Sequence, residues 1–222
     1  MPSRRTWLIT GGAVAVVAAA AVGGPLVYAA IEGDAPPAPT VQVQPEAVEL
    51  TADTDGTWAI APSSTAGYRV EEVLNGADVT VAGTTDQVTG TVVVSGGDLA
   101  DADVTVDVAS ITTDSGRRDS YFRDNVMDVD THPTATFSVT EVADLPELTG
   151  TPVTVPVTGE LTLAGVTQPV QTEMSVVRTA EGVDVSGSVP VTFADHGIEA
   201  PDLGFVRVED TGSIEFLLHL TL

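Results

Sequence analysis

Hydrophobic and polar residues alternate along most of the chain from Thr57 onward. Over 102–109, for example, valines at every second position are separated by Asp and Thr. A period of two places apolar side chains on one face of an extended segment and polar side chains on the other, which is typical of half-buried antiparallel strands. The same alternation recurs in the segments 134–142, 153–163, 170–178, 183–189 and 214–222.

Glycine-containing turns separate these segments, and no long helical period lies between them. The turns are Asn75-Gly76, Gly96-Gly97, Gly165, Glu181-Gly182 and Thr211-Gly212. The pattern therefore predicts an all-β domain, and about eight strands of this length predict an antiparallel barrel that either fills its interior or encloses one small ligand. One short helix is expected over Arg117–Met127, with Ser115 as its N-terminal cap.

The N-terminal residues 1–31 have a different pattern. Arg4 and Arg5 precede an uncharged run from Trp7 to Ile31, and 25 residues would span about 37 Å as a helix, enough to cross a hydrocarbon core of roughly 30 Å. The positive-inside rule then leaves the rest of the chain outside the cytoplasm. The length favours a retained transmembrane signal anchor, whereas the small residues around Tyr28 favour a cleaved signal peptide and secretion. Both alternatives remain open.

Residues 32–55 are rich in Pro, Ala, Thr and acidic residues and contain no aromatic residue. Such a composition buries too little apolar surface to order itself, so we expect a disordered linker. The chain is thus divided into an N-terminal anchor or signal peptide (1–31), this linker (32–55) and a β-barrel domain (56–222).

Composition excludes several kinds of chemistry. The net charge is −24, every one of the 8 basic residues is Arg, and there is no Lys or Cys. A disulfide framework, a thiolate nucleophile and a Schiff-base lysine are therefore excluded, and so polyanionic a chain is not expected to bind nucleic acid. The three histidines lack metal-ligand spacing and no nucleophile elbow is present, so we expect no metal, no cofactor and no enzymatic activity.

Seven segments of the barrel domain, taken in order, resemble the YceI-like family of polyisoprenoid-binding, lipocalin-like proteins. The most specific one runs from Arg117-Arg118-Asp119 to His132-Pro133, although the opening Tyr68-Arg69-Val70 differs from the form common in the family. The resemblance implies an eight-stranded antiparallel lipocalin-like barrel that encloses a long isoprenoid lipid or quinone without catalysis. The segments are 57–72, 81–90, 107–114, 117–137, 159–170, 193–198 and 210–218.

Large apolar residues on the predicted strands and helix are candidates for the wall of a cavity. Aromatic residues make up only 5% of the chain, and small side chains do not easily fill an extended barrel. For each candidate an ordinary core position is an equal alternative, because strand alternation does not separate a filled interior from a hollow one. The candidates are Trp58, Tyr68, Val104, Val106, Phe122, Phe137, Leu161, Phe193 and Phe205.

Three of the arginines, Arg117, Arg118 and Arg123, lie close together in the sequence. They are candidates for binding a lipid head group at the mouth of the barrel. The alternative, which we favour, is that they pair with nearby carboxylates and hold a loop. The expected partners are Asp119, Asp124, Asp128 or Asp130.

Two functions follow from these predictions. The first is an isoprenoid-binding protein at the outer face of the cytoplasmic membrane, held there by its N-terminal helix and capable of forming a homodimer. The second is a stalked β-domain with a filled core that contacts another envelope protein and holds no ligand. A continuous internal cavity would favour the first function.

Overall fold

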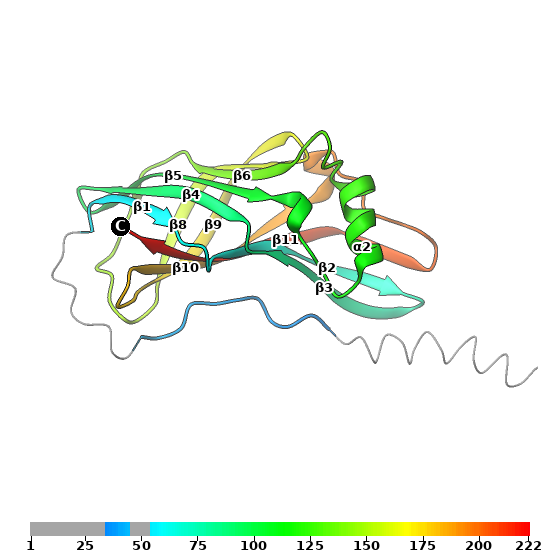
Figure 1. Ribbon diagram of the computed structural model, residues 1–222, viewed down its shortest axis with the longest axis horizontal. Helices are drawn as coiled ribbons and strands as arrows, with labels where there is room; N and C mark the ends of the chain where they lie inside the picture. Colours follow the sequence, from blue (N-terminus) through cyan, green and yellow to red (C-terminus); the bar gives the residue numbers. More distant parts are fainter. Residues whose placement is uncertain (1–33, 45–53) are drawn as a thin grey trace, which may run out of the picture.

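The computed structural model describes residues 34–44 and 54–222, and it forms an elongated β-structure with one helical segment near one end (Figure 1). The strands are β1 (Gly56–Ile60), β2 (Thr65–Leu74), β3 (Ala77–Thr85), β4 (Val88–Ser95), β5 (Asp98–Asp107), β6 (Thr134–Val139), β7 (Ala143–Asp144), β8 (Val153–Leu163), β9 (Val166–Arg178), β10 (Val183–Thr192) and β11 (Val206–Thr221). The helical segments are η1 (Val108–Ser110), α2 (Gly116–Tyr121), η2 (Phe122–Val126) and η3 (Phe193–His196).

Eight of these strands close into an antiparallel barrel. Their order is β1-β4-β5-β6-β8-β9-β10-β11, and β1 pairs back with β11 through Ala59–Thr221 and Ile60–Leu220. Closure removes the exposed edges that an open sheet would have. The prediction of an all-β, eight-stranded antiparallel barrel with one short helix is therefore confirmed.

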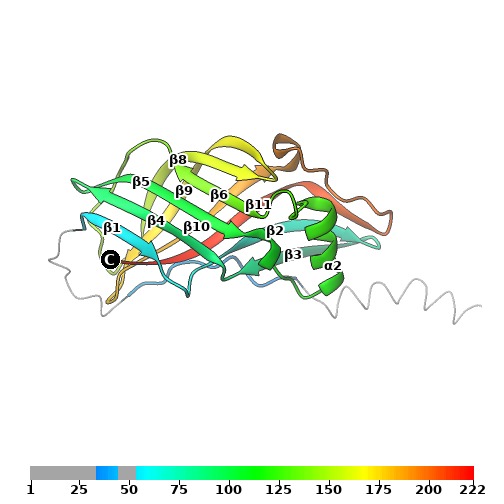
Figure 2. The same cartoon turned by 45° about the horizontal axis from the view of Figure 1, so that its top comes forward.

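Strands β2 and β3 extend the sheet beyond the closed barrel, and they are joined to it through the long strand β11. This 16-residue strand pairs with β1 near its C-terminus and with β2 from Val206 to Leu217, and β2 in turn pairs with β3. The gap beyond β3 is closed by the segment that carries α2 and η2, which is joined to β3 by a bridge between Thr84 and Thr112. Figure 2 shows α2 beside β2 and β3 at this end of the molecule.

The alternation seen in the sequence is the alternation of burial in the strands. On β8, Val155, Val157, Leu161 and Leu163 are buried, and Glu160 on the other face is exposed. The predicted helix also lies where the sequence placed it, but it is a short α-helix followed by a turn of π-helix. Ser115 occupies the N-cap position, yet its side chain makes no capping hydrogen bond.

The transmembrane or signal helix expected over 1–31 lies outside the described residues. Among the helices that are described, none has the length and apolar character needed to span a bilayer.

Residues 34–44 differ from the disordered linker that the composition predicts. They form an extended segment, hereafter the strap, that runs along the outside of the barrel (Figure 1). At its start the Ala35 amide donates to the Thr80 carbonyl on β3 (3.0 Å), and at its end the Gln44 amide donates to the Gly150 carbonyl (2.7 Å). The strap therefore joins two distant parts of the barrel.

The middle of the strap covers polar groups of the barrel wall. Arg69 donates from Nη2 to the Pro36 carbonyl (2.6 Å) and from Nε to the Glu215 carboxylate (2.7 Å). The Val41 amide donates to Oγ of Ser186 (3.1 Å), and Val41, Ser186 and Glu215 are all buried. These contacts order a segment whose own composition is typical of disorder, because the barrel supplies partners for its backbone.

Candidate functional site

The interior of the barrel is a continuous apolar cavity of about 260 Å³. Every strand of the closed barrel contributes to its wall, as do α2 and η2. The wall is built mainly from Val, Leu, Ala and Phe, and its few polar side chains include Glu72, Arg118, Thr136 and Ser213. Such an enclosed apolar space suits a hydrophobic ligand rather than a charged substrate.

Four aromatic rings lie on the wall of this cavity, each against a glycine. A Cβ atom built on any of these glycines would come within 3.0 Å of the ring, so each ring occupies the space above a residue that has no side chain. These rings therefore pack directly against the backbone of the barrel wall. The pairs are Tyr68 with Gly83, Phe137 with Gly159, Phe193 with Gly212, and Phe216 with Gly187.

Most of the residues singled out in the sequence lie on this wall. The eight that do are Trp58, Tyr68, Val104, Val106, Phe122, Phe137, Leu161 and Phe193.

Phe205 is the exception, because its side chain is 57% exposed and it precedes β11 in a surface turn. Sequence reasoning also missed residues that line the cavity, such as Phe216, Val157 and Val189. The strand alternation that placed Leu161 would have found them.

One end of the cavity, hereafter the helix end, is covered by α2 and η2. There the ring of Phe122 stacks on the ring of Tyr68, with centroids 4.8 Å apart. Burial raises the pKa of Tyr68 to about 12, against the opposing effect of Arg118 and with a further rise from Asp119 and Glu72. The Tyr68 hydroxyl is therefore neutral at physiological pH.

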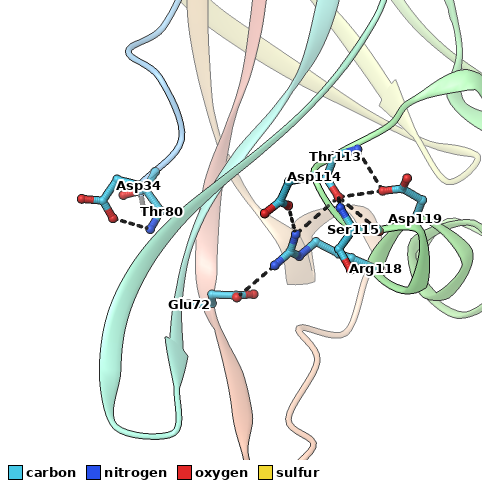
Figure 3. Close-up of polar contacts among 8 residues, drawn as sticks. All are labelled: Asp34, Glu72, Thr80, Thr113, Asp114, Ser115, Arg118 and Asp119. Carbon is cyan, nitrogen blue, oxygen red and sulfur yellow. Dashed lines mark hydrogen bonds and ion pairs between the residues drawn. The ribbon is translucent and has the colours of Figure 1, made fainter. Parts of the chain in front are cut away.

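Arg118 is a cation that lines the cavity at the helix end, and three side chains bind it (Figure 3). Its Nη2 lies 3.5 Å from Oε1 of the buried Glu72, its Nη1 donates to Oγ1 of Thr113 (3.3 Å), and Nη1 also pairs with Asp114. Burial lowers the pKa of Arg118, but the Glu72 and Asp114 carboxylates raise it, and the net change is a rise.

The three arginines of the sequence cluster do not act together. Arg118 lines the cavity, whereas neither Arg117 nor Arg123 does. The partners of Arg118 are also not those expected, because Asp119 instead accepts hydrogen bonds from the amide (2.9 Å) and hydroxyl (2.7 Å) of Thr113. The geometry at Arg118 is thus that of a side chain that fastens α2 to β2.

The opposite end of the cavity, hereafter the β1 end, is lined by Trp58, Val183 and Leu220. Here the guanidinium of Arg178 lies over the Trp58 ring, with its Cζ 5.5 Å from the ring centroid. Arg178 is only 5% exposed, and within the described residues its Nε and Nη1 have no hydrogen-bond partner. Burial lowers its pKa. Sequence reasoning assigned no role to this residue.

Metal-ligand chemistry has no site in the part of the chain that the structure describes. No group of three His, Cys, Asp or Glu side chains there could hold a metal ion. Two of the histidines have other partners: Nδ1 of His219 lies 2.7 Å from Asp184, and Nδ1 of His196 lies 3.1 Å from the Val166 carbonyl.

A family model of the YceI-like domain matches residues 58–220, which span the whole barrel from β1 to β11. The chain belongs to the YceI-like family. Among curated proteins, no sequence matches this YceI-like chain.

Solved structures share the fold of this YceI-like barrel. Burkholderia cenocepacia BcnA is 21% identical, with a TM-score of 0.60 over 73% of this chain and 99% of BcnA. A polyisoprenoid-binding domain from Saccharophagus degradans implicated in plant cell wall breakdown is 20% identical, with a TM-score of 0.60 over 74% of this chain and 97% of that domain. At these identities the comparison establishes the fold.

Proposed function

We propose that the protein is a non-catalytic binding protein that encloses a long apolar isoprenoid lipid or quinone in its barrel. The observation that carries this proposal is the continuous apolar cavity between the helix end and the β1 end. The name of the Saccharophagus degradans relative, a polyisoprenoid-binding domain, points to the same class of ligand. The cavity also favours this function over a protein-contact domain with a filled core.

An isoprenoid chain fits the chemistry of the wall. Removal of apolar surface from water contributes about 25 cal/mol per Å², and it needs no directed polar partner along the chain. Nothing in the middle of the wall would have to distinguish one isoprene unit from the next. The candidate wall residues Trp58, Phe137 and Leu161 would therefore act by shape and apolar contact.

The test is to identify what the full-length protein carries when it is purified from native membranes. Native mass spectrometry should show added mass on the protein, and organic extraction should release an isoprenoid lipid or quinone. A protein that is purified empty, and that takes up no isoprenoid when lipid is supplied, would contradict the proposal.

We also propose that the apolar segment 7–31 holds the barrel at the outer face of the cytoplasmic membrane. The start of the strap indicates which end of the barrel such an anchor would be near, because the Thr80 amide on β3 donates to the Asp34 carboxylate (3.2 Å), only three residues after Ile31 (Figure 3). Glu72, which pairs with Arg118, is opposite Val79 in the next register position. A membrane anchor at Ile31 would thus keep the helix end of the cavity near the bilayer.

Because the chain contains no Cys, single cysteines can report this orientation. Ser120 on α2 and Ser95 at the far end of β4 are both exposed and provide a matched pair. In vesicles that contain a lipid-borne quencher, a fluorophore at Ser120→Cys should be quenched more than one at Ser95→Cys. Equal or reversed quenching would contradict the orientation.

Size-exclusion chromatography of the detergent-solubilised protein would test the predicted homodimer.

A further inference from the structure

The chain that leads into β11 forms a hairpin over residues 201–208, and its tip presents two large apolar side chains to the outside. Leu203 is 47% exposed and Phe205 is 57% exposed, and only Gly204 separates them. Each of the other exposed large apolar side chains in the described residues stands alone in the sequence. The hairpin lies against the β2–β3 turn, because the Asn75 amide donates to the Phe205 carbonyl (2.8 Å), and Figure 1 shows both at the same end of the molecule. Single exposed apolar residues are common, whereas a pair at one tip is a candidate contact surface.

The backbone of this hairpin is held by hydrogen bonds of its own. Asp202 and Arg207 form an antiparallel bridge, and the Leu203 amide donates to the Val206 carbonyl (2.9 Å). The Gly204 amide donates to Oδ1 of Asp202 (3.0 Å). The amides of the tip therefore have partners inside the protein, which lowers the cost of moving the tip from water into an apolar phase.

The base of the hairpin is part of the cavity wall. Pro201 and Val208 both line the cavity, and the Val208 amide donates to the Pro201 carbonyl (3.0 Å). Val208 is also the register partner of Glu72 on β2, another wall residue, which pairs with Arg118 at the helix end. One short hairpin thus connects the exposed apolar tip with the helix end of the cavity.

The same part of the sheet receives the chain that follows the N-terminal apolar segment. On β3, Val79 lies in the same row of register partners as Val208 of the hairpin. The next residue of β3, Thr80, donates its amide to the Asp34 carboxylate (3.2 Å), and Asp34 is three residues after Ile31. A membrane anchor that ends at Ile31 would therefore hold a bilayer within a few residues of the hairpin base.

A neutral lipid surface suits this tip better than a protein partner does. Two partly exposed side chains offer far less area than the roughly 800 Å² that each partner contributes to a stable protein interface. The chain has a net charge of −24, so an anionic surface would repel it, whereas the tip Leu203-Gly204-Phe205 carries no charged side chain. Phe and Leu side chains insert readily at the boundary between lipid head groups and acyl chains.

We propose that the 201–208 hairpin docks on the surface of a zwitterionic lipid bilayer by inserting Leu203 and Phe205. The inference rests on the proposed lipid-binding function and membrane location, and it adds the surface through which the barrel contacts the membrane. With the tip inserted, Pro201 and Val208 bring the helix end of the cavity close to the bilayer that supplies the isoprenoid lipid. Docking should therefore raise the rate at which the cavity is loaded and leave the amount bound at equilibrium unchanged.

A fluorophore on the tip tests the insertion directly, because the chain contains no other Cys to label. The full-length protein is labelled at Leu203→Cys and studied in phosphatidylcholine vesicles. Val142→Cys is the matched control, because Val142 is 66% exposed and precedes β7, which pairs with β5 at the end of β5 that is far from α2. A nitroxide carried by the lipid should quench the fluorophore at 203 more strongly than the one at 142, and iodide in the water should quench it less.

The rate of loading tests what the insertion does. A short-chain ubiquinone is supplied in the vesicles, and in a Trp7→Phe background Trp58, which lines the cavity, is the single tryptophan that reports its uptake. The double variant Leu203→Ser/Phe205→Ser should lower the docked fraction, and with it the loading rate, by about 10-fold. Its melting temperature and the amount of quinone bound at equilibrium should be those of the wild type, because both side chains are exposed.

The matched control for loading is Val43→Ser/Val142→Ser, which removes two exposed apolar side chains elsewhere on the protein and should load at the wild-type rate. Equal lipid quenching at 203 and 142 would overturn the docking. Protection of 203 from iodide without lipid quenching would assign the tip to a protein contact instead, and a double variant that loads as fast as the wild type would overturn the role in loading.

Two further outcomes separate this inference from the proposals on which it rests. A wild-type protein that takes up no quinone, while the fluorophore at 203 is quenched by lipid, would overturn the lipid-binding function and leave the docking in place. A full-length protein that does not float with the vesicles would overturn the membrane location and the docking together.

Discussion

The cavity has one arginine at each end, and the two are held in opposite ways. At the helix end, Arg118 is 22% exposed and is bound by Glu72, Asp114 and Thr113. At the β1 end, Arg178 is less exposed and has buried N–H groups without a partner in the described residues. The side chain with more access to water thus has more partners inside the protein.

This difference separates an arginine whose side-chain hydrogen bonds join two elements from one whose Nε and Nη1 make no hydrogen bond in the described residues. The hydrogen bonds of Arg118 join α2 to β2 and close the end of the barrel, so that its charge is already neutralised by carboxylates. Arg178 contacts the Trp58 ring on β1, but within the part of the chain that is described its Nε and Nη1 make no hydrogen bond. The comparison predicts opposite effects on stability when each arginine is made neutral.

The largest effect is expected from Arg118→Met. It leaves the buried Glu72 carboxylate without this partner, so the free energy of unfolding should fall by about 2–3 kcal/mol. Chemical denaturation measures the change, and Arg117→Met on the same helix is the control, because Arg117 is exposed. Equal stability of Arg118→Met and Arg117→Met would contradict the structural role of Arg118 at the helix end.

A substitution between the two ends tests whether they share one cavity. In Gly187→Ala the new Cβ would lie 2.5 Å from Cζ of Phe216, so the ring, which lines the cavity, must shift. We expect a loss of about 1–2 kcal/mol in stability from overpacking, together with less co-purified lipid.

Gly116→Ala is the matched control for this substitution, because nothing lies within 4 Å of the added Cβ. Lipid content that is unchanged in Gly187→Ala would show that the ring of Phe216 does not bound the ligand. Mass spectrometry of extracts from the two variants decides between these results.

The helix end should also respond to alkaline pH, through Tyr68. Its pKa is about 12 in the folded protein, above the ordinary value of 10, so stability from the neutral phenol is fully present below pH 10 and is lost as pH rises toward 12. Between pH 10 and 11 the loss should be roughly 1 kcal/mol. Comparison of the wild type with Tyr68→Phe isolates this contribution, and identical pH profiles of the two proteins would contradict it.

The sequence predicted the barrel well because strand alternation is a repeated signal. Val104, Val106 and Leu161 were recognised as inward candidates from a period of two, and the structure places all three on the cavity wall. Phe205 was a candidate only because it is a large aromatic residue, and no alternation supported it; its side chain is 57% exposed. Phe216 was missed although it follows the alternation of β11.

The contacts that distinguish the two ends could not be predicted in this way. Arg178 is an isolated arginine at the end of a strand, and whether its Nε and Nη1 find hydrogen-bond partners among the described residues depends on which loops reach it. The strap has the composition of a linker, and its order comes from the Thr80, Gly150 and Ser186 groups, which are distant in sequence. Both features arise from single long-range contacts, which leave no pattern in one sequence.

The smallest effect is expected where the strap connects the two ends. Ser186→Ala removes the acceptor of the Val41 amide, and one hydrogen bond of this kind contributes about 0.5–1 kcal/mol. Hydrogen exchange at Val41 should become faster, while Ser188→Ala, at an exposed position of the same strand, should not change it.

The pattern of exchange also shows how the strap is held. Ala35 binds near the helix end and Gln44 near the β1 end, so faster exchange at Val41 alone would mean that the strap is fastened separately at its two ends. Faster exchange along the whole strap would mean that it is held to the barrel as one unit, and unchanged exchange at Val41 would contradict the role of Ser186.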